Sequence, residues 1–126
     1  MAPNQKAEKQ HDLLPYKGKI ERFIEPCLLL LLAEKPAHGY ELIEPLSQFD
    51  FEPNVDPGQI YRTLRRMEKH GFVVSNWETG KAGPARRRYQ LTAQGEGFLT
   101  SWIKTLTKRV QMIEKLLQRY DQIMER

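Results

Sequence analysis

The stretch DPGQIYRTLRRMEKHG, residues 56–71, predicts a short helix with two unlike faces. Asp56 before Pro57 is typical of an N-cap followed by a first-turn proline, and Gly71 is typical of a helix end. At about 100° per residue the apolar side chains share one stripe, and the polar and cationic ones lie opposite. The stripe holds Ile60, Leu64 and Met67, and the opposite side holds Gln59, Arg62, Arg65, Arg66 and Lys69. This arrangement fits an anionic partner, and it also fits a plain solvated face.

The distribution of charge favours the anionic partner. The 126 residues carry a formal net charge of only +4. Residues 56–90 hold eight Lys and Arg against three acids, so this segment alone exceeds the charge of the whole chain. Clustering of this kind indicates a polyanion as partner.

The single cysteine, Cys27, excludes an intrachain disulfide, and its apolar neighbours favour a buried structural thiol over a nucleophile. The apolar run at 28–33 is too short to cross a bilayer, so no membrane contact is expected. The N-terminal residues show no secretory pattern. We therefore expect a reducing, cytoplasmic setting.

The part before residue 56 predicts a flexible tail and two helices. Residues 1–18 are polar without a sustained period and are expected to form the tail. Residues 20–33 are apolar nearly all round, which predicts a helix at the centre of the domain or at a subunit interface, with Pro26 kinking it or starting its second half. A second helix is expected after His38, with Glu41 reaching back to its start and Pro45 bending or ending it.

The part after residue 71 predicts a β-hairpin and then one long helix. FVVSNWE and RRRYQL are strand-like runs around a loop rich in Gly and Pro, and Lys81, Arg86 and Arg87 lie in this loop or at its base. From the N-cap Thr92 onward, apolar residues recur every four and three positions, a heptad seam over about 45 Å of helix. The seam consists of Leu99, Ile103, Leu106, Val110, Ile113, Leu117, Tyr120 and Met124. We expect it to pair with a second copy of the chain; the alternative is packing along the first helix of the same chain, and both contacts are compatible.

Three helices followed by a hairpin are the order of a winged helix-turn-helix domain. The predicted fold is mainly α with a small β-hairpin: a winged helix-turn-helix DNA-binding domain over residues 19–91 and a dimerisation helix over 92–126. B-DNA's major groove admits one helix and is read by Arg and Gln, while a basic wing can reach the adjacent backbone. Double-stranded DNA is therefore the expected partner.

The motifs HGYEL, DPGQIYRTLRRMEKHGFV and GPARRRYQLTAQG, in this order, resemble the signature of PadR-type transcriptional regulators over residues 20–98. The single C-terminal helix resembles the short subgroup, and the run GxxYRTLRxxEK is similar to that of poly-β-hydroxybutyrate-responsive repressors. The resemblance implies a homodimeric repressor that dimerises through its first and last helices. It also implies that one set of residues faces the groove and that another serves the wing. The first set is Gln59, Tyr61, Arg62 and Arg66, and the second is Lys81, Arg86 and Arg87. Tyr61 is equally consistent with a phosphate contact and with packing.

Trp102 has two interpretations. It fits the core of a dimer interface, and it also fits a platform for a flat apolar effector, with Phe98 as its neighbour. The resemblance implies the second interpretation, because aromatic residues on the last helix often line such sites in the family.

The predicted function is a DNA-binding repressor that a small or apolar effector releases. The alternative is a protein-binding adaptor or anti-activator that keeps the winged fold. An enzyme is not expected, because the sequence shows no Ser/His/Asp set, no phosphate loop and no paired carboxylates in an apolar setting. The three histidines have no zinc spacing, so neither a metal nor a cofactor is predicted.

Overall fold

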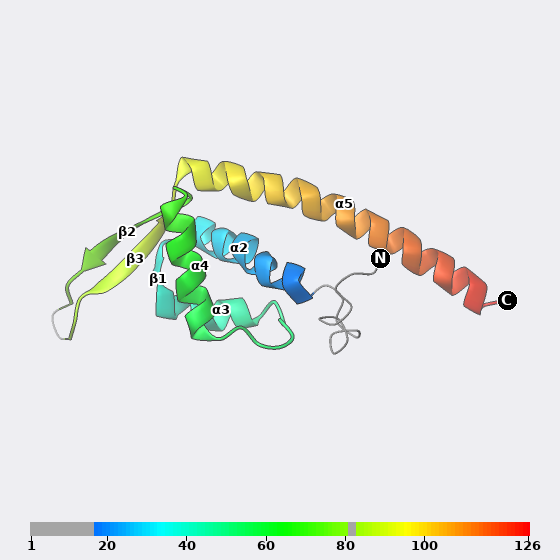
Figure 1. Ribbon diagram of the computed structural model, residues 1–126, viewed down its shortest axis with the longest axis horizontal. Helices are drawn as coiled ribbons and strands as arrows, with labels where there is room; N and C mark the ends of the chain where they lie inside the picture. Colours follow the sequence, from blue (N-terminus) through cyan, green and yellow to red (C-terminus); the bar gives the residue numbers. More distant parts are fainter. Residues whose placement is uncertain (1–16, 81–82) are drawn as a thin grey trace, which may run out of the picture.

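The computed structural model describes residues 17–80 and 83–126, and its first helix, α2, lies at the centre of the fold (Figure 1). The elements in chain order are α2 (Lys17–Glu34), β1 (Ala37–His38), the 3-10 helix η1 (Gly39–Leu42), α3 (Ile43–Ser47), α4 (Pro57–Lys69), β2 (Val73–Glu78), β3 (Arg86–Leu91) and α5 (Ala93–Met124). Sixteen of the residues predicted to form the tail lie outside the described part. The architecture is mainly helical with a small sheet, as predicted.

Helix α2 is central because its apolar side chains point in several directions. Its buried residues are Ile24, Cys27, Leu28, Leu29 and Leu32, and α4, α5 and β3 all pack against it. Pro26 lies inside this helix, which continues through it from Lys17 to Glu34. The alternative that a helix starts at Pro26 is therefore wrong, and the expected kink stays a prediction.

The expected second helix is broken into two short pieces. Glu41 accepts a hydrogen bond from the backbone N–H of His38 at 2.7 Å, which confirms the predicted reach-back. The first turn is nevertheless the 3-10 helix η1, and α3 has only five residues, with Pro45 at its middle. Leu42 and Leu46 are buried in the core, so their burial holds the segment although neither piece is long enough to be stable alone.

Helix α4 forms as its sequence predicts. The Asp56 side chain accepts a hydrogen bond from the backbone N–H of Gln59 at 2.9 Å, and the Gln59 side-chain oxygen accepts one from the backbone N–H of Asp56. Ile60, Leu64 and Met67 are buried against the core. Gly71, with φ of 84°, takes the left-handed conformation that ends the helix and turns the chain into β2.

The sheet contains the predicted hairpin and one unpredicted strand. β2 and β3 pair antiparallel from Val73 opposite Leu91 to Glu78 opposite Arg86. β1 pairs with the other edge of β3, with Ala37 opposite Tyr89, so the order is β1-β3-β2. A two-residue strand has no period of its own, and its partner decides its conformation.

Helix α5 begins on the domain and then leaves it. Thr92 accepts from the Gly95 N–H at 3.0 Å as the predicted N-cap. The first turns pack against α2, with Phe98 and Leu99 partly buried, and the rest of the helix runs on beyond the core (Figure 1). Both alternatives for this helix therefore remain open: its start packs along the first helix of its own chain, and its later turns are free to pair.

Candidate nucleic-acid interface

The exposed face of α4 is a row of cations. Arg62, Arg65 and Lys69 are all exposed, and we call these three residues the cationic ridge. Among the side chains of residues 22–80 and 83–126, no carboxylate lies within 4.0 Å of any of the three. The Arg62 guanidinium lies beside Gly58, where a Cβ would approach its Nη1 to 3.1 Å, so the charge is held near the N-terminal end of the helix. The ridge is thus available to an anion.

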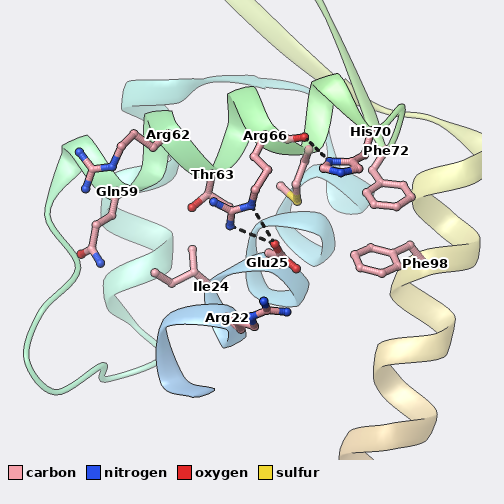
Figure 2. Close-up of a pocket in the computed structure, with 11 residues that line it drawn as sticks. Arg22, Ile24, Glu25, Gln59, Arg62, Thr63, Arg66, His70, Phe72 and Phe98 are labelled. Carbon is pink, nitrogen blue, oxygen red and sulfur yellow. Dashed lines mark hydrogen bonds and ion pairs between the residues drawn. The ribbon is translucent and has the colours of Figure 1, made fainter. Parts of the chain in front are cut away.

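A hollow of about 750 Å³ lies between α4 and α2, and we call it the α2 hollow (Figure 2). Its lining residues are Arg22, Ile24, Glu25, Gln59, Arg62, Thr63, Arg66, Met67, His70, Phe72 and Phe98. Arg66 does not extend outward with the ridge, because it points across the hollow to Glu25, as Figure 2 shows. Of the groove-facing candidates, Arg66 therefore points towards α2, while Gln59 and Arg62 line the same hollow without such a contact.

A second hollow of about 600 Å³ lies on the other side of α4, against the wing strands; we call it the wing hollow. Its lining residues are His38, Gly39, Tyr40, Tyr61, Arg65, Trp77, Ala85, Arg86, Arg87 and Tyr89. The candidate residues Tyr61, Arg65, Arg86 and Arg87 thus meet here although they come from separate parts of the chain. The cationic ridge stands between two hollows that both contain arginines.

Aromatic rings hold the wing arginines. Arg86 donates to the Tyr40 hydroxyl at 2.6 Å, and its guanidinium carbon lies 5.0 Å from the centre of that ring. Arg87 stacks over Trp77 at 5.0 Å. Trp77 is 63% exposed, so Arg87 stacks on a ring that is not packed into the hydrophobic core. Cation–π contacts of this kind orient the guanidinium without cancelling its charge.

Carboxylates tie the wing to the rest of the domain. Glu68 of α4 accepts from the backbone N–H and the hydroxyl of Ser75, at 3.1 and 2.8 Å, and from Arg87 at 3.2 Å. His38 lies between Glu41, 3.0 Å away, and Glu78, 2.8 Å away. The hydrogen bond from the His38 backbone N–H lowers the pKa of Glu41. Glu68 therefore has a structural role.

Tyr61 packs over the backbone of Gly39, where an added Cβ would lie 2.3 Å from its Cε1. A side chain at position 39 would push the ring away, so glycine is required for this contact. The ring remains partly exposed and lines the wing hollow. Packing of Tyr61 is therefore present, and its hydroxyl as a phosphate ligand stays a prediction.

Sequence reasoning missed several residues that shape the interface. They are Glu25, Tyr40, Ser75 and Trp77, which reach the candidate arginines through long-range contacts. Trp77 lies opposite Arg87 in the hairpin, so the register of the predicted hairpin was a usable signal for it. Nothing local marks Glu25, which lies 41 residues before its partner Arg66. Lys81 lies outside the described residues.

The effector candidates Phe98 and Trp102 are partly buried and touch each other edge to face, with ring centres 6.4 Å apart. Phe98 also stacks on Phe72, with ring centres 4.1 Å apart and planes inclined by 7°. Phe72 follows the end of α4, so this stack connects α5 to α4. Trp102 lines neither of the two hollows described above.

The predicted seam on α5 is uncovered beyond its first turns. Leu99 and Leu106 are partly buried, whereas the other six members are exposed. These six are Ile103, Val110, Ile113, Leu117, Tyr120 and Met124. Leaving such a stripe in water is unfavourable, since each fully buried aliphatic side chain stabilises a protein by about 1.5–3 kcal/mol.

The part of the chain that the structure describes contains one free cysteine, Cys27. No group of three or more His, Cys, Asp and Glu side chains is placed to hold a metal ion there. Burial raises the pKa of the Cys27 thiol to about 12, so it stays protonated at neutral pH and is a poor nucleophile. None of the described helices has the length and hydropathy needed to cross a membrane.

The profile of the family described as "Transcriptional regulator PadR-like family" matches residues 28–101. This chain belongs to that family. The match includes α4, both wing strands and the start of α5. The PadR-like family consists of transcriptional regulators rather than enzymes, as predicted, and the fold is a winged helix.

Relatives and solved structures agree with this membership. Transcriptional regulator Rv3488 of Mycobacterium tuberculosis is 38% identical over 68 residues, which are 54% of this chain and 61% of that relative. A PadR-like transcriptional regulator from Bacillus cereus is 27% identical, covers 82% of this chain and 95% of that one, and superimposes with a TM-score of 0.67. A PadR-like transcription factor from Bacteroides fragilis is 25% identical over 79% of this chain and 95% of that one, with a TM-score of 0.68. None of these three is described as a poly-β-hydroxybutyrate-responsive repressor, so that subtype stays a prediction, as does the cytoplasmic location.

Proposed function

We propose that this PadR-like regulator is a homodimeric repressor that binds a specific site in double-stranded DNA and is released by a small apolar effector. The observation that carries the DNA-binding part is the cationic ridge on α4, which is exposed and has no acidic partner among the side chains of residues 22–80 and 83–126. The repressor role rests on the family resemblance.

The dimensions of α4 suit the major groove. A helix with its side chains is about 10–12 Å wide, and the groove is about 12 Å wide. With the ridge in the groove, Gln59 and Arg62 near the N-terminal end are the candidates for base edges, and Arg65 and Lys69 lie farther along the helix. Arg and Gln are the side chains whose paired donors and acceptors suit guanine and adenine.

The two hollows suit the sugar–phosphate backbones that border a groove. When the ridge enters the groove, one backbone passes the wing hollow, where Tyr40 holds Arg86. Arg87 stacks there on Trp77 but is also paired with Glu68, so Arg86 is the better candidate for a phosphate. The other backbone passes the α2 hollow, with Arg22 on its wall. Lys81 keeps its predicted role at the wing loop.

The proposed dimer forms through the α5 seam. Its exposed apolar residues recur at heptad spacing, which suits pairing with an identical helix better than contact with an irregular surface. A paired seam fixes the separation of the two α4 helices. Two reading helices can occupy one face of DNA when they lie about 34 Å apart, or a multiple of that distance.

The proposed effector site is the region of Phe98 and Trp102. Phe98 touches both Phe72 at the end of α4 and Trp102 on α5, so a flat apolar ligand there would change how the helix leaves the domain. Such a ligand weakens DNA binding only to the extent that it binds more tightly to a dimer whose α4 helices are wrongly spaced for DNA than to the dimer that fits DNA. A coupling of about 1–3 kcal/mol corresponds to roughly 5- to 150-fold weaker DNA binding.

The decisive experiment is binding of the purified protein to DNA upstream of its own gene, over a salt series. We expect one tight site and a strong fall of affinity with salt. Binding without preference over random DNA would contradict a specific regulator. No DNA binding at all, with dimerisation intact, would favour the adaptor function.

A further inference from the structure

The ion pair between Glu25 and Arg66 joins α2 to α4. The Arg66 Nη2 and Nε atoms both donate to Glu25 Oε2, at 3.0 and 3.3 Å. The Glu25 side chain is only 14% exposed, whereas that of Arg66 is 48% exposed. The carboxylate is thus partly desolvated inside the α2 hollow, and Arg66 is its cationic partner (Figure 2).

This pair separates Arg66 from the other cations of α4. Arg62, Arg65 and Lys69 form no ion pair with the side chains of residues 22–80 and 83–126, while the charge of Arg66 is balanced by a carboxylate. If Arg66 moved to a DNA phosphate, Glu25 would stay behind as a partly buried carboxylate without its cation. Losing the partner of such a charge is costly, and a nearby phosphate would repel it.

The physics of DNA binding makes this separation important. Each phosphate that a free cation neutralises releases counterions, and this gain does not depend on sequence. A regulator must discriminate against a large excess of random DNA, so a cation that binds any phosphate lowers specificity while it raises affinity. An arginine already neutralised by a carboxylate adds little to random binding.

We infer that Glu25 is a specificity-determining residue: it withholds Arg66 from DNA phosphates and thereby keeps affinity for random DNA low. This inference rests on the proposed DNA-binding function. It assigns α2, which otherwise serves the core, a part in discrimination between DNA sites.

The test measures binding to a random-sequence duplex, so it needs no knowledge of the operator. Fluorescence anisotropy compares the full-length protein with Glu25→Gln between about 50 and 200 mM salt. We expect Glu25→Gln to bind random DNA more tightly at low salt and to have a salt slope steeper by about 0.9 per protomer. Over this fourfold range the slope change is an extra loss of affinity of roughly 3.5-fold per protomer.

Two charge-neutral double variants form the matched control. Glu25→Gln with Arg66→Gln removes the pair, and we expect affinity and slope like those of the unmodified protein. Glu34→Gln with Arg65→Gln changes the same charges on the same two helices but removes a ridge cation. There we expect the slope to flatten by about 0.9 per protomer.

The outcomes separate the inference from the function on which it rests. Unchanged or weaker random binding by Glu25→Gln would overturn the inference, and so would a gain that persists in the variant that also lacks Arg66. No DNA binding by the unmodified protein at low salt would instead overturn the proposed function. Thermal unfolding of each variant checks its fold, and if Glu25→Gln unfolds, a flattened slope for the Glu25/Arg66 double variant still contradicts the inference.

Discussion

Helices α4 and α5 are both amphipathic, but the domain covers the apolar face of only one of them. The stripe of α4 is buried against α2 and its neighbours, and its cations are left outside. The seam of α5 is covered at Leu99 and then exposed for most of its length. The same amphipathic pattern therefore leaves an electrostatic surface on one helix and a hydrophobic surface on the other.

The difference indicates two different kinds of partner. A charged surface is stable in water without a partner, so the cationic face of α4 can stay exposed until a polyanion binds it. An apolar stripe of this length is unstable in water, so α5 is expected to be paired at all times. We therefore propose that DNA binding is the reversible contact and that dimerisation is the permanent one.

The largest expected effect comes from breaking the α5 surface. Val110→Asp places a charge in the seam, where burial without a partner is costly, so we expect the dimer to dissociate at micromolar concentration. Sedimentation measures the change in mass. Gln111→Asp adds the same side chain away from the seam and should leave the dimer intact; a monomeric unmodified protein would rule out the seam as a dimer interface.

A matched pair of leucines tests whether the two apolar faces differ as described. Leu64 is fully buried, and Leu64→Ala should lower the free energy of unfolding by about 2–5 kcal/mol at any protein concentration. Leu117 is 54% exposed in the single chain, so Leu117→Ala should destabilise mainly through the dimer. Denaturant unfolding at several protein concentrations distinguishes them, and equal effects in dilute solution would contradict the comparison.

The polar face of α4 is tested by separating base contacts from backbone contacts. Arg62→Ala should reduce discrimination between operator and random DNA by about 1–3 kcal/mol, because a bidentate base contact is lost. Lys81→Ala should weaken all sequences about equally and lower the salt slope by about one. Binding titrations on both DNAs measure this, and identical behaviour of the two variants would show that helix and wing have the same role.

The smallest expected effect concerns the two N-caps. Asp56 and Thr92 each accept a hydrogen bond from the backbone N–H three residues later. Replacing either by Ala should lower the free energy of unfolding by about 0.5–2 kcal/mol, and thermal unfolding measures it. We expect Asp56→Ala also to weaken DNA binding, because its helix carries the ridge, and Thr92→Ala to have the lesser effect on DNA.

Local patterns were sufficient for the elements whose stability is local. The caps, the apolar stripe of α4, the hairpin and the seam of α5 were all predicted, because side-chain period and capping residues are properties of adjacent positions. Reasoning from local sequence failed where contacts with other elements of the fold decide the local structure. Helix α2 continues through Pro26, since the elements packed around it hold it, and the segment after His38 becomes a 3-10 turn and a short helix.

The sequence by itself determined which helix carries the cations and which carries the heptad seam, because both features are periodic along the chain. Only the tertiary structure decided which cations are free. Arg66 lies among the ridge residues in sequence, yet a carboxylate 41 residues away neutralises it. Arg86 likewise depends on Tyr40, which is 46 residues away. The physical reason is that charge pairing depends on distance in space, and the packing of α2, η1 and the wing around α4 sets that distance.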